Sequence, residues 1–130
     1  MTPEEHEAKA REIERTLGKC GDADYEMAIE GAMLAGTHRL NSILHRSGVT
    51  PPELDVLHTY MLTVNDLRRY RVAAAMAVDA LTAIEDIRPG YVRGNLPGGA
   101  AAAARATSLL ALIRKEAAEA KPLARPGFPA

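Results

Sequence analysis

Residues 25–46 constrain the fold most, because they form a helical pattern that is apolar or nearly without side chain around most of its circumference. At about 100° per residue, one side carries the large apolar residues Ile29, Met33, Leu40, Ile43 and Leu44. The neighbouring side carries only small residues: Ala28, Gly31, Ala32, Ala35 and Gly36. A glycine inside a helix costs about 1 kcal/mol relative to alanine, so we expect these positions to allow close helix packing. Such a helix is predicted to lie at the centre of a bundle.

Helical patterns also occupy most of the remaining chain. A segment rich in Glu, Lys, Arg and Ala predicts a mostly solvated helix from Pro3 to about Cys20. Thr50 is a candidate N-cap for a long helix over residues 52–87, and the sequence at residues 63–66 indicates a kink or short break that would divide it into two. Arg88-Pro89 is expected to end that helix, and an Ala-rich run predicts a last helix over residues 100–120.

The composition agrees with helices and disfavours sheets. Aromatic residues make up only 4% of the 130 residues, and there is no Trp, whereas β-sandwiches and barrels draw on aromatic and β-branched side chains. A single cysteine, Cys20, excludes an internal disulfide framework. We therefore predict an all-α protein, a compact four- or five-helix up-and-down bundle. Residues 1–121 are expected to form one domain, followed by a flexible Pro-rich tail over residues 122–130.

Charge and hydropathy indicate the surroundings of the protein. Residues 1–87 hold 9 Lys or Arg and 15 Asp or Glu, whereas residues 88–130 hold 7 and 2. The acidic and basic parts are expected to attract each other within the fold or across a dimer, or the basic part binds an anion or nucleic acid. The chain has neither an apolar run of about 18 residues nor a signal peptide, so we expect a cytoplasmic protein without membrane contact. The apolar and small surface of residues 25–46 predicts a homo-oligomer, most simply a dimer.

A polar stripe lies on the remaining side of the 25–46 helix and holds Glu30, His38, Asn41 and His45. One interpretation is a solvated face, or a set of hydrogen-bonded groups at a dimer seam. Another is a metal site formed by Glu30, His38, His45 and, from the next segment, His58, because imidazole and carboxylate groups bind zinc, iron and manganese. The sequence contains neither a Glu-x-x-His nor a His-Glu-x-x-His motif.

Within the same helix, Arg39-Leu40-Asn41-Ser42-Ile43-Leu44-His45 holds an arginine and a histidine with five residues between them. This segment resembles the Arg-x(4–6)-His motif of HEPN-domain proteins, which are small all-α bundles, often dimeric, and include metal-independent ribonucleases. The resemblance implies His45 as general acid or base, Arg39 as phosphate contact and Asn41 as polar helper. It covers seven residues. The family motif usually lies in a later helix, with the asparagine directly after the arginine.

The stretch between residues 88 and 99 is a second candidate site. It holds Arg88 and Arg93, and Gly98 and Gly99 precede the last predicted helix. Free backbone N–H groups at a helix N-terminus favour an anion. The alternative is a plain connection between helices, since the segment has no P-loop motif.

The leading functional hypothesis from sequence is a dimeric interaction or regulatory module with a protein or RNA partner and no cofactor. The first alternative is a HEPN-like ribonuclease or toxin that uses Arg39 and His45. The second is a metal-binding bundle. The sequence leaves open whether the protein is an enzyme.

Overall fold

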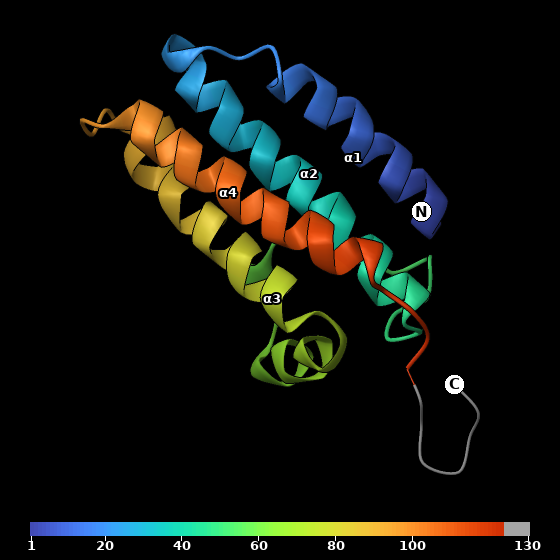
Figure 1. Cartoon of the computed structure of the whole chain (residues 1–130). Helices are drawn as coiled ribbons and strands as arrows, with labels where there is room; N and C mark the ends of the chain where they lie inside the picture. Colours follow the sequence, from blue (N-terminus) through green and yellow to red (C-terminus); the bar gives the residue numbers. More distant parts are fainter. Residues whose placement is uncertain (124–130) are drawn as a thin grey trace.

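The computed structural model describes residues 1–123 and confirms the predicted all-α bundle (Figure 1). The described residues contain four α-helices: α1 (Pro3–Leu17), α2 (Tyr25–Arg46), α3 (Val64–Arg88) and α4 (Gly99–Ala118). Short turns of other helical types lie at Asp22–Asp24 (η1), Thr59–Met61 (η2) and Pro89–Arg93 (η3). Residues 124–130, most of the predicted tail, lie outside the described residues.

Helix α2 occupies the centre of the bundle, as the sequence predicts. It packs against α1, α3 and α4, and its five large apolar residues are all buried. Its glycines allow the close approach expected of them: a Cβ at Gly31 would lie 2.4 Å from Leu17 of α1, and one at Gly36 would lie 3.0 Å from Ile113 of α4. The small-residue side of α2 is therefore covered by helices of the same chain, and this surface is not left over for a second copy.

The helix predicted over residues 52–87 is wrong in its first part. No α-helix forms between Ser47 and Thr63, and Thr50 is buried instead of capping a helix. Helix α3 begins at Val64 because Thr63 and Asp66 form a reciprocal capping box. The residues that gave residues 52–64 a helical rhythm are consequently exposed: Leu54, Leu57, Met61 and Val64.

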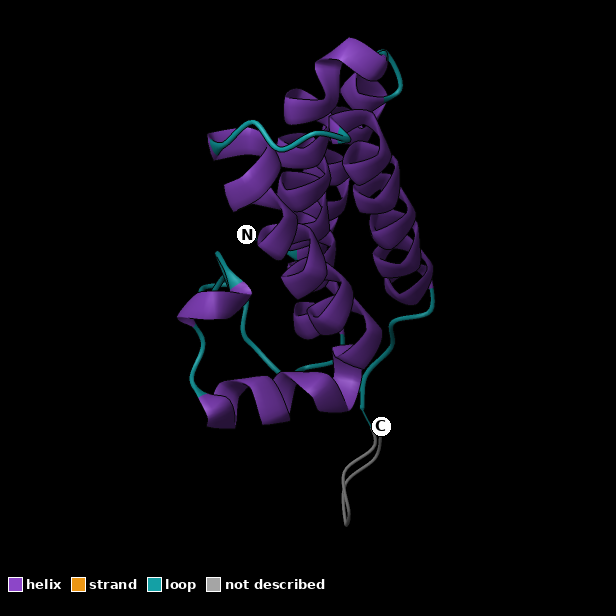
Figure 2. Cartoon of the chain, turned by 90° about the vertical axis from the view of Figure 1, so that its left-hand side faces the viewer, coloured by secondary structure: helices purple, strands orange, loops and turns teal. Residues whose placement is uncertain are grey.

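A kink at Ala74 divides α3 into two parts. Ala74 has non-helical backbone angles (φ −143°, ψ 40°). The first part crosses the end of the bundle, and the second runs along it (Figure 2). The carboxylate of Glu116, from α4, accepts hydrogen bonds from the backbone N–H groups of Met76 (3.4 Å) and Ala77 (2.9 Å). Glu116 thereby serves the N-terminus of the second part as an N-cap side chain would, because the methyl side chain of Ala74 has no polar atom.

The remaining helix ends lie within three residues of the prediction. Arg88-Pro89 ends the α-helix as expected, but Arg88 keeps helical angles and the chain continues through the single π-turn η3. The apolar face of α2 and the second part of α3 enclose the core with α4. None of the helices in the described part of the chain has the length and apolarity needed to cross a membrane.

Candidate functional site

An irregular segment, residues 51–58, precedes η2 and is hydrogen-bonded to α2. Asn41 holds it there. The Asn41 Oδ1 atom accepts a hydrogen bond from the Val56 N–H (2.7 Å), and its Nδ2 atom donates to the carbonyl oxygen of Val56 (2.8 Å) and to that of Thr37 (3.0 Å). Asn41 is fully buried. This pair of bonds to one residue fixes the segment and positions its neighbour, Asp55.

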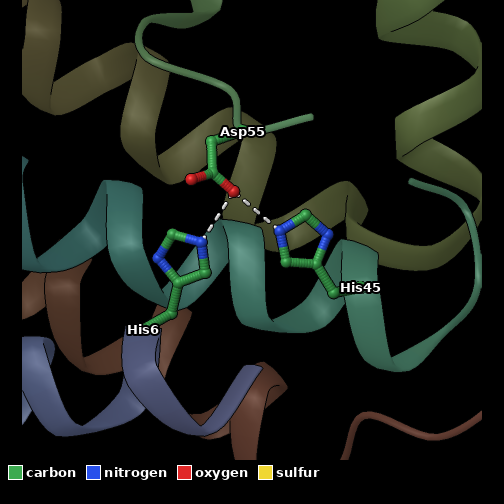
Figure 3. Close-up of side chains that lie close together, drawn as sticks. All are labelled: His6, His45 and Asp55. Atoms are coloured by element: carbon green, nitrogen blue, oxygen red, sulfur yellow. Dashed lines mark hydrogen bonds and ion pairs between the residues drawn. The ribbon is translucent and has the colours of Figure 1, made fainter. Parts of the chain in front are cut away.

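Asp55 joins two histidines from different helices (Figure 3). Its Oδ1 atom lies 2.8 Å from Nε2 of His6, on α1, and 2.8 Å from Nε2 of His45, on α2. The three potential ligand atoms lie within 4.8 Å of one another. The two histidine side chains are almost wholly buried (2% and 0% exposed), while Asp55 is 27% exposed. We call His6, His45 and Asp55 the His–Asp cluster.

The outer nitrogen of each histidine in the His–Asp cluster also has a partner. Nδ1 of His6 lies 2.9 Å from Nδ1 of His38. Nδ1 of His45 lies 2.8 Å from the Thr50 hydroxyl and 3.2 Å from the Thr50 carbonyl oxygen. These contacts at Nδ1 fix the orientation of both rings, and the Nε2 atoms are directed at the same carboxylate oxygen. Such outer partners are typical of histidines that bind metals.

The charges in the cluster follow from its hydrogen bonds and its burial. Burial by itself would raise the pKa of Asp55, but the hydrogen bonds from His45, His6 and the N-terminal ammonium outweigh it and lower the pKa to about 2. Burial lowers the pKa of His6, although Asp55 opposes this effect, and burial also lowers the pKa of His38. At neutral pH the carboxylate is therefore ionised, and His6 and His38 are neutral.

Two members of the cluster, His6 and Asp55, face a cavity of about 370 Å³. Its walls also contain His38, Asn41, His58 and Arg88. The rest of the lining is mostly apolar: Met1, Met33, Leu34, Thr37, Val56 and Leu57. A cavity of this size, largely apolar with a few converging polar groups, is typical of small-molecule sites.

The four residues predicted as a metal set do not form one. Only His45 belongs to the His–Asp cluster, and His38 contacts it from outside through His6. Glu30 binds the guanidinium of Arg88 (Nε to Oε1, 2.6 Å), and His58 binds the buried carboxylate of Glu85 (3.0 Å). The prediction assumed that His58 lies on a helix beside α2, whereas it lies in the irregular segment.

The residues that carry the HEPN resemblance lie at different places. The guanidinium of Arg39 binds Glu14 of α1 (Nη2 to Oε1, 2.7 Å) and lines a shallow groove with Arg114 and Lys115 of α4. The amide of Asn41 bonds to backbone groups of Thr37 and Val56, and His45 binds Asp55. The hydrogen bonds and ion pairs of Arg39 and His45 among the described residues have no partner in common.

The residues of the predicted anion site between residues 88 and 99 do not converge on one place either. Arg88 is bound by Glu30, and Arg93 is exposed at the other end of η3. Both glycines have local structural reasons. Gly98 has a φ of +90°, which glycine adopts easily, and a Cβ at Gly99 would lie 2.5 Å from the ring of Tyr25.

Sequence reasoning missed His6 and Asp55. A signal existed for His6, because it lies on the same helix face as Ala10, Ile13 and Leu17, the apolar stripe of α1. A histidine that continues an apolar stripe is a candidate for burial. Asp55 gave no such signal, since its segment carries a helical rhythm that the fold does not use.

Comparison of the chain with known proteins finds no family model, no curated protein and no solved structure that matches it.

Proposed function

We propose that this protein binds a divalent transition-metal ion at His6, His45 and Asp55. The observation that carries the proposal is the convergence of two buried Nε2 atoms on one ionised carboxylate oxygen. Two imidazoles and one carboxylate are a ligand set used for zinc and for non-haem iron, with further coordination positions left to water or substrate.

The outer contacts of the cluster support this function. A neutral histidine that binds a metal through Nε2 carries its hydrogen on Nδ1 and donates it to a neighbouring acceptor. The Thr50 carbonyl oxygen is in position to accept from His45, and Nδ1 of His38 is in position to accept from His6. Both ligands therefore have the outer acceptor that metal binding requires.

The location supports a site that exchanges ligands with its surroundings. His6 and Asp55 line the 370 Å³ cavity, so an ion held by them would adjoin a space from which water or a small molecule could reach it. Catalytic zinc sites have such an open position, whereas structural sites have four protein ligands. The proposed function is accordingly a ligand-binding metal centre.

The test is metal titration of the tag-free protein after treatment with a chelator. Isothermal calorimetry with Zn²⁺, and separately with anaerobic Fe²⁺, is expected to give one ion per chain with micromolar or tighter affinity. The variants H6A, H45A and D55N are each expected to weaken binding by at least about 100-fold, since each removes one of three ligands. D55N keeps an oxygen that accepts from both rings, so it separates metal binding from folding.

His58 provides the matched control. It lines the same cavity but binds Glu85 instead of the cluster, so H58A is expected to keep full metal affinity. Wild-type protein that binds neither ion, or D55N that binds as tightly as wild type while both are folded by circular dichroism, would overturn the proposal.

A further inference from the structure

We propose that the metal centre, once loaded, binds a small carboxylate with an apolar substituent in the adjoining cavity, and that His38 donates a hydrogen bond to it. This inference rests on the proposed metal site. It assigns a role to a histidine outside the ligand set.

The hydrogens of the metal-free cluster can be placed from its geometry. The Asp55 carboxylate only accepts hydrogen bonds, so Nε2 of His6 carries a hydrogen and donates it to Asp55 (2.8 Å). A neutral His6 then has a lone pair on Nδ1. Nδ1 of His38, at 2.9 Å, must therefore be the donor. In the metal-free state, His38 has its hydrogen on Nδ1 and a lone pair on Nε2.

Metal binding reverses this arrangement without changing the number of protons. The ion takes the lone pair of Nε2 of His6, so the hydrogen of His6 moves to Nδ1. His6 then donates to Nδ1 of His38, whose own hydrogen must lie on Nε2. Nε2 of His38 makes no hydrogen bond within the described residues, and His38 lines the cavity. Loading therefore changes Nε2 of His38 from an acceptor into a donor, on a side chain that lines the cavity.

The charges and walls of the cavity define the ligand. A divalent ion with one carboxylate ligand leaves one net positive charge, which favours an anionic head group, and the His38 donor beside it suits a second oxygen of that group. The wall also holds two cations that already have partners: Arg88 is bound by Glu30 through Nε and Nη2, and the N-terminal ammonium of Met1 is bound by Asp55 and by the carbonyl oxygen of Pro52. Apolar side chains, including Met33, Leu34 and Leu57, form the walls around these groups. A monocarboxylate with an apolar substituent matches both parts.

The experiment uses the Co²⁺-loaded protein, because the visible absorption of Co²⁺ changes when an exogenous ligand enters its coordination sphere. Titration with benzoate is expected to change the spectrum at lower concentration than titration with acetate, since only benzoate uses the apolar walls. Benzamide, which has the same shape but no charge, is expected to leave the spectrum unchanged. The metal-free protein is expected to bind benzoate at least about 10-fold more weakly.

Variants of the cavity separate the two proposals. H38L is expected to weaken benzoate binding by about 10-fold or more at saturating Co²⁺, whereas H38Q, whose amide can donate from nearly the same place, retains most of it. T37F is expected to fill the cavity and abolish benzoate binding while Co²⁺ still binds.

Each failure has a distinct meaning. A Co²⁺ spectrum that forms but does not respond to benzoate, or an H38L variant that binds benzoate like wild type, would overturn this inference alone. Failure of the wild-type protein to bind Co²⁺, seen before any carboxylate is added, would overturn the metal site and this inference together.

Discussion

Asn41 does for residues 51–58 what a neighbouring strand does in a sheet, because it offers both a donor and an acceptor to one backbone residue. Neither an aspartate nor a leucine at position 41 could make both bonds. Aspartate lacks the donor, and leucine lacks both groups. The position of Asp55, and with it the His–Asp cluster, depends on this single amide.

Replacement of Asn41 by leucine is expected to destabilise the protein by about 2–4 kcal/mol, because two buried backbone groups of Val56 lose their partners. Urea denaturation at pH 7 measures the effect. S42A, at a neighbouring buried position whose hydroxyl only bonds to Arg39 in its own helix, is expected to cost about 1 kcal/mol or less. Equal losses in the two variants would contradict the assigned role of Asn41.

The titration of the cluster predicts how stability depends on pH. The pKa of His6 and of His38 is lowered in the fold, so the unfolded chain takes up protons first as the pH falls through about 6.5, and stability decreases from there. The pKa of Asp55 is lowered from 3.8 to about 2, so a second decrease follows between about pH 4 and pH 2. Thermal melts of chelator-treated protein across this range test both windows.

D55N is the informative comparison for the acid window. It has no carboxyl group to titrate at position 55, so its melting temperature is expected to fall less than that of the wild type below pH 4. An unchanged slope in this variant would place the acid sensitivity elsewhere.

At the scale of elements, the kink in α3 is stabilised by a group from another helix. E116A is expected to cost about 1 kcal/mol, the usual value of an N-cap side chain, because the N–H groups of Met76 and Ala77 lose their acceptor. E116Q keeps an acceptor oxygen and is expected to lose less. E119A changes a nearby exposed glutamate whose side chain makes no hydrogen bond or ion pair in the described chain, and it is expected to leave stability unchanged; a loss equal to that of E116A would contradict the capping role.

An added Cβ would come almost equally close to a neighbouring side chain at Gly31 and at Gly99, but we expect the two substitutions to change stability by different amounts. A Cβ at Gly31 would meet the terminal methyl of Leu17 at 2.4 Å, and one at Gly99 would meet the ring of Tyr25 at 2.5 Å. Leu17 can turn away, and alanine gains about 1 kcal/mol of helix propensity at Gly31. We expect G31A to be nearly neutral and G99A to cost about 1–3 kcal/mol, as measured by chemical denaturation. A larger loss of stability in G31A than in G99A would show that the ring of Tyr25 moves aside more easily than the side chain of Leu17.

At the scale of the whole molecule, bound metal would join α1, α2 and the irregular segment. A ligand that binds only the folded state at 100 times its dissociation constant stabilises it by about 2.7 kcal/mol. Saturating Zn²⁺ is therefore expected to raise the melting temperature by about 10 °C for a chain of this size, and a chelator is expected to reverse the rise. D55N is expected to show no rise; a rise in D55N equal to that in wild type would place the ion elsewhere.

Much of the fold could be predicted from local patterns. The central position of α2 could be predicted, because one side of this helix carries large apolar residues and the neighbouring side carries small ones. Burying both sides requires several neighbouring helices. The segment before α3 was mispredicted because Leu54, Leu57 and Met61 repeat at helical spacing, while the capping box at Thr63 starts the helix later. The candidate site lay beyond local patterns, since its members are 39 and 10 residues apart in sequence and meet only after α1 has docked on α2.

The attachment of residues 51–58 has a kinetic consequence. The segment belongs to no helix, and the Asn41 amide and the bonds to Asp55 are its main polar ties to α1 and α2. We expect it to open at a lower free energy than the helical core, because it belongs to no helix; opening must also release the buried Val56 and the bond between His58 and Glu85. Entry and departure of an ion would then follow the opening rate of this one segment, and the lifetime of the bound state would be set by a local event that leaves the bundle folded.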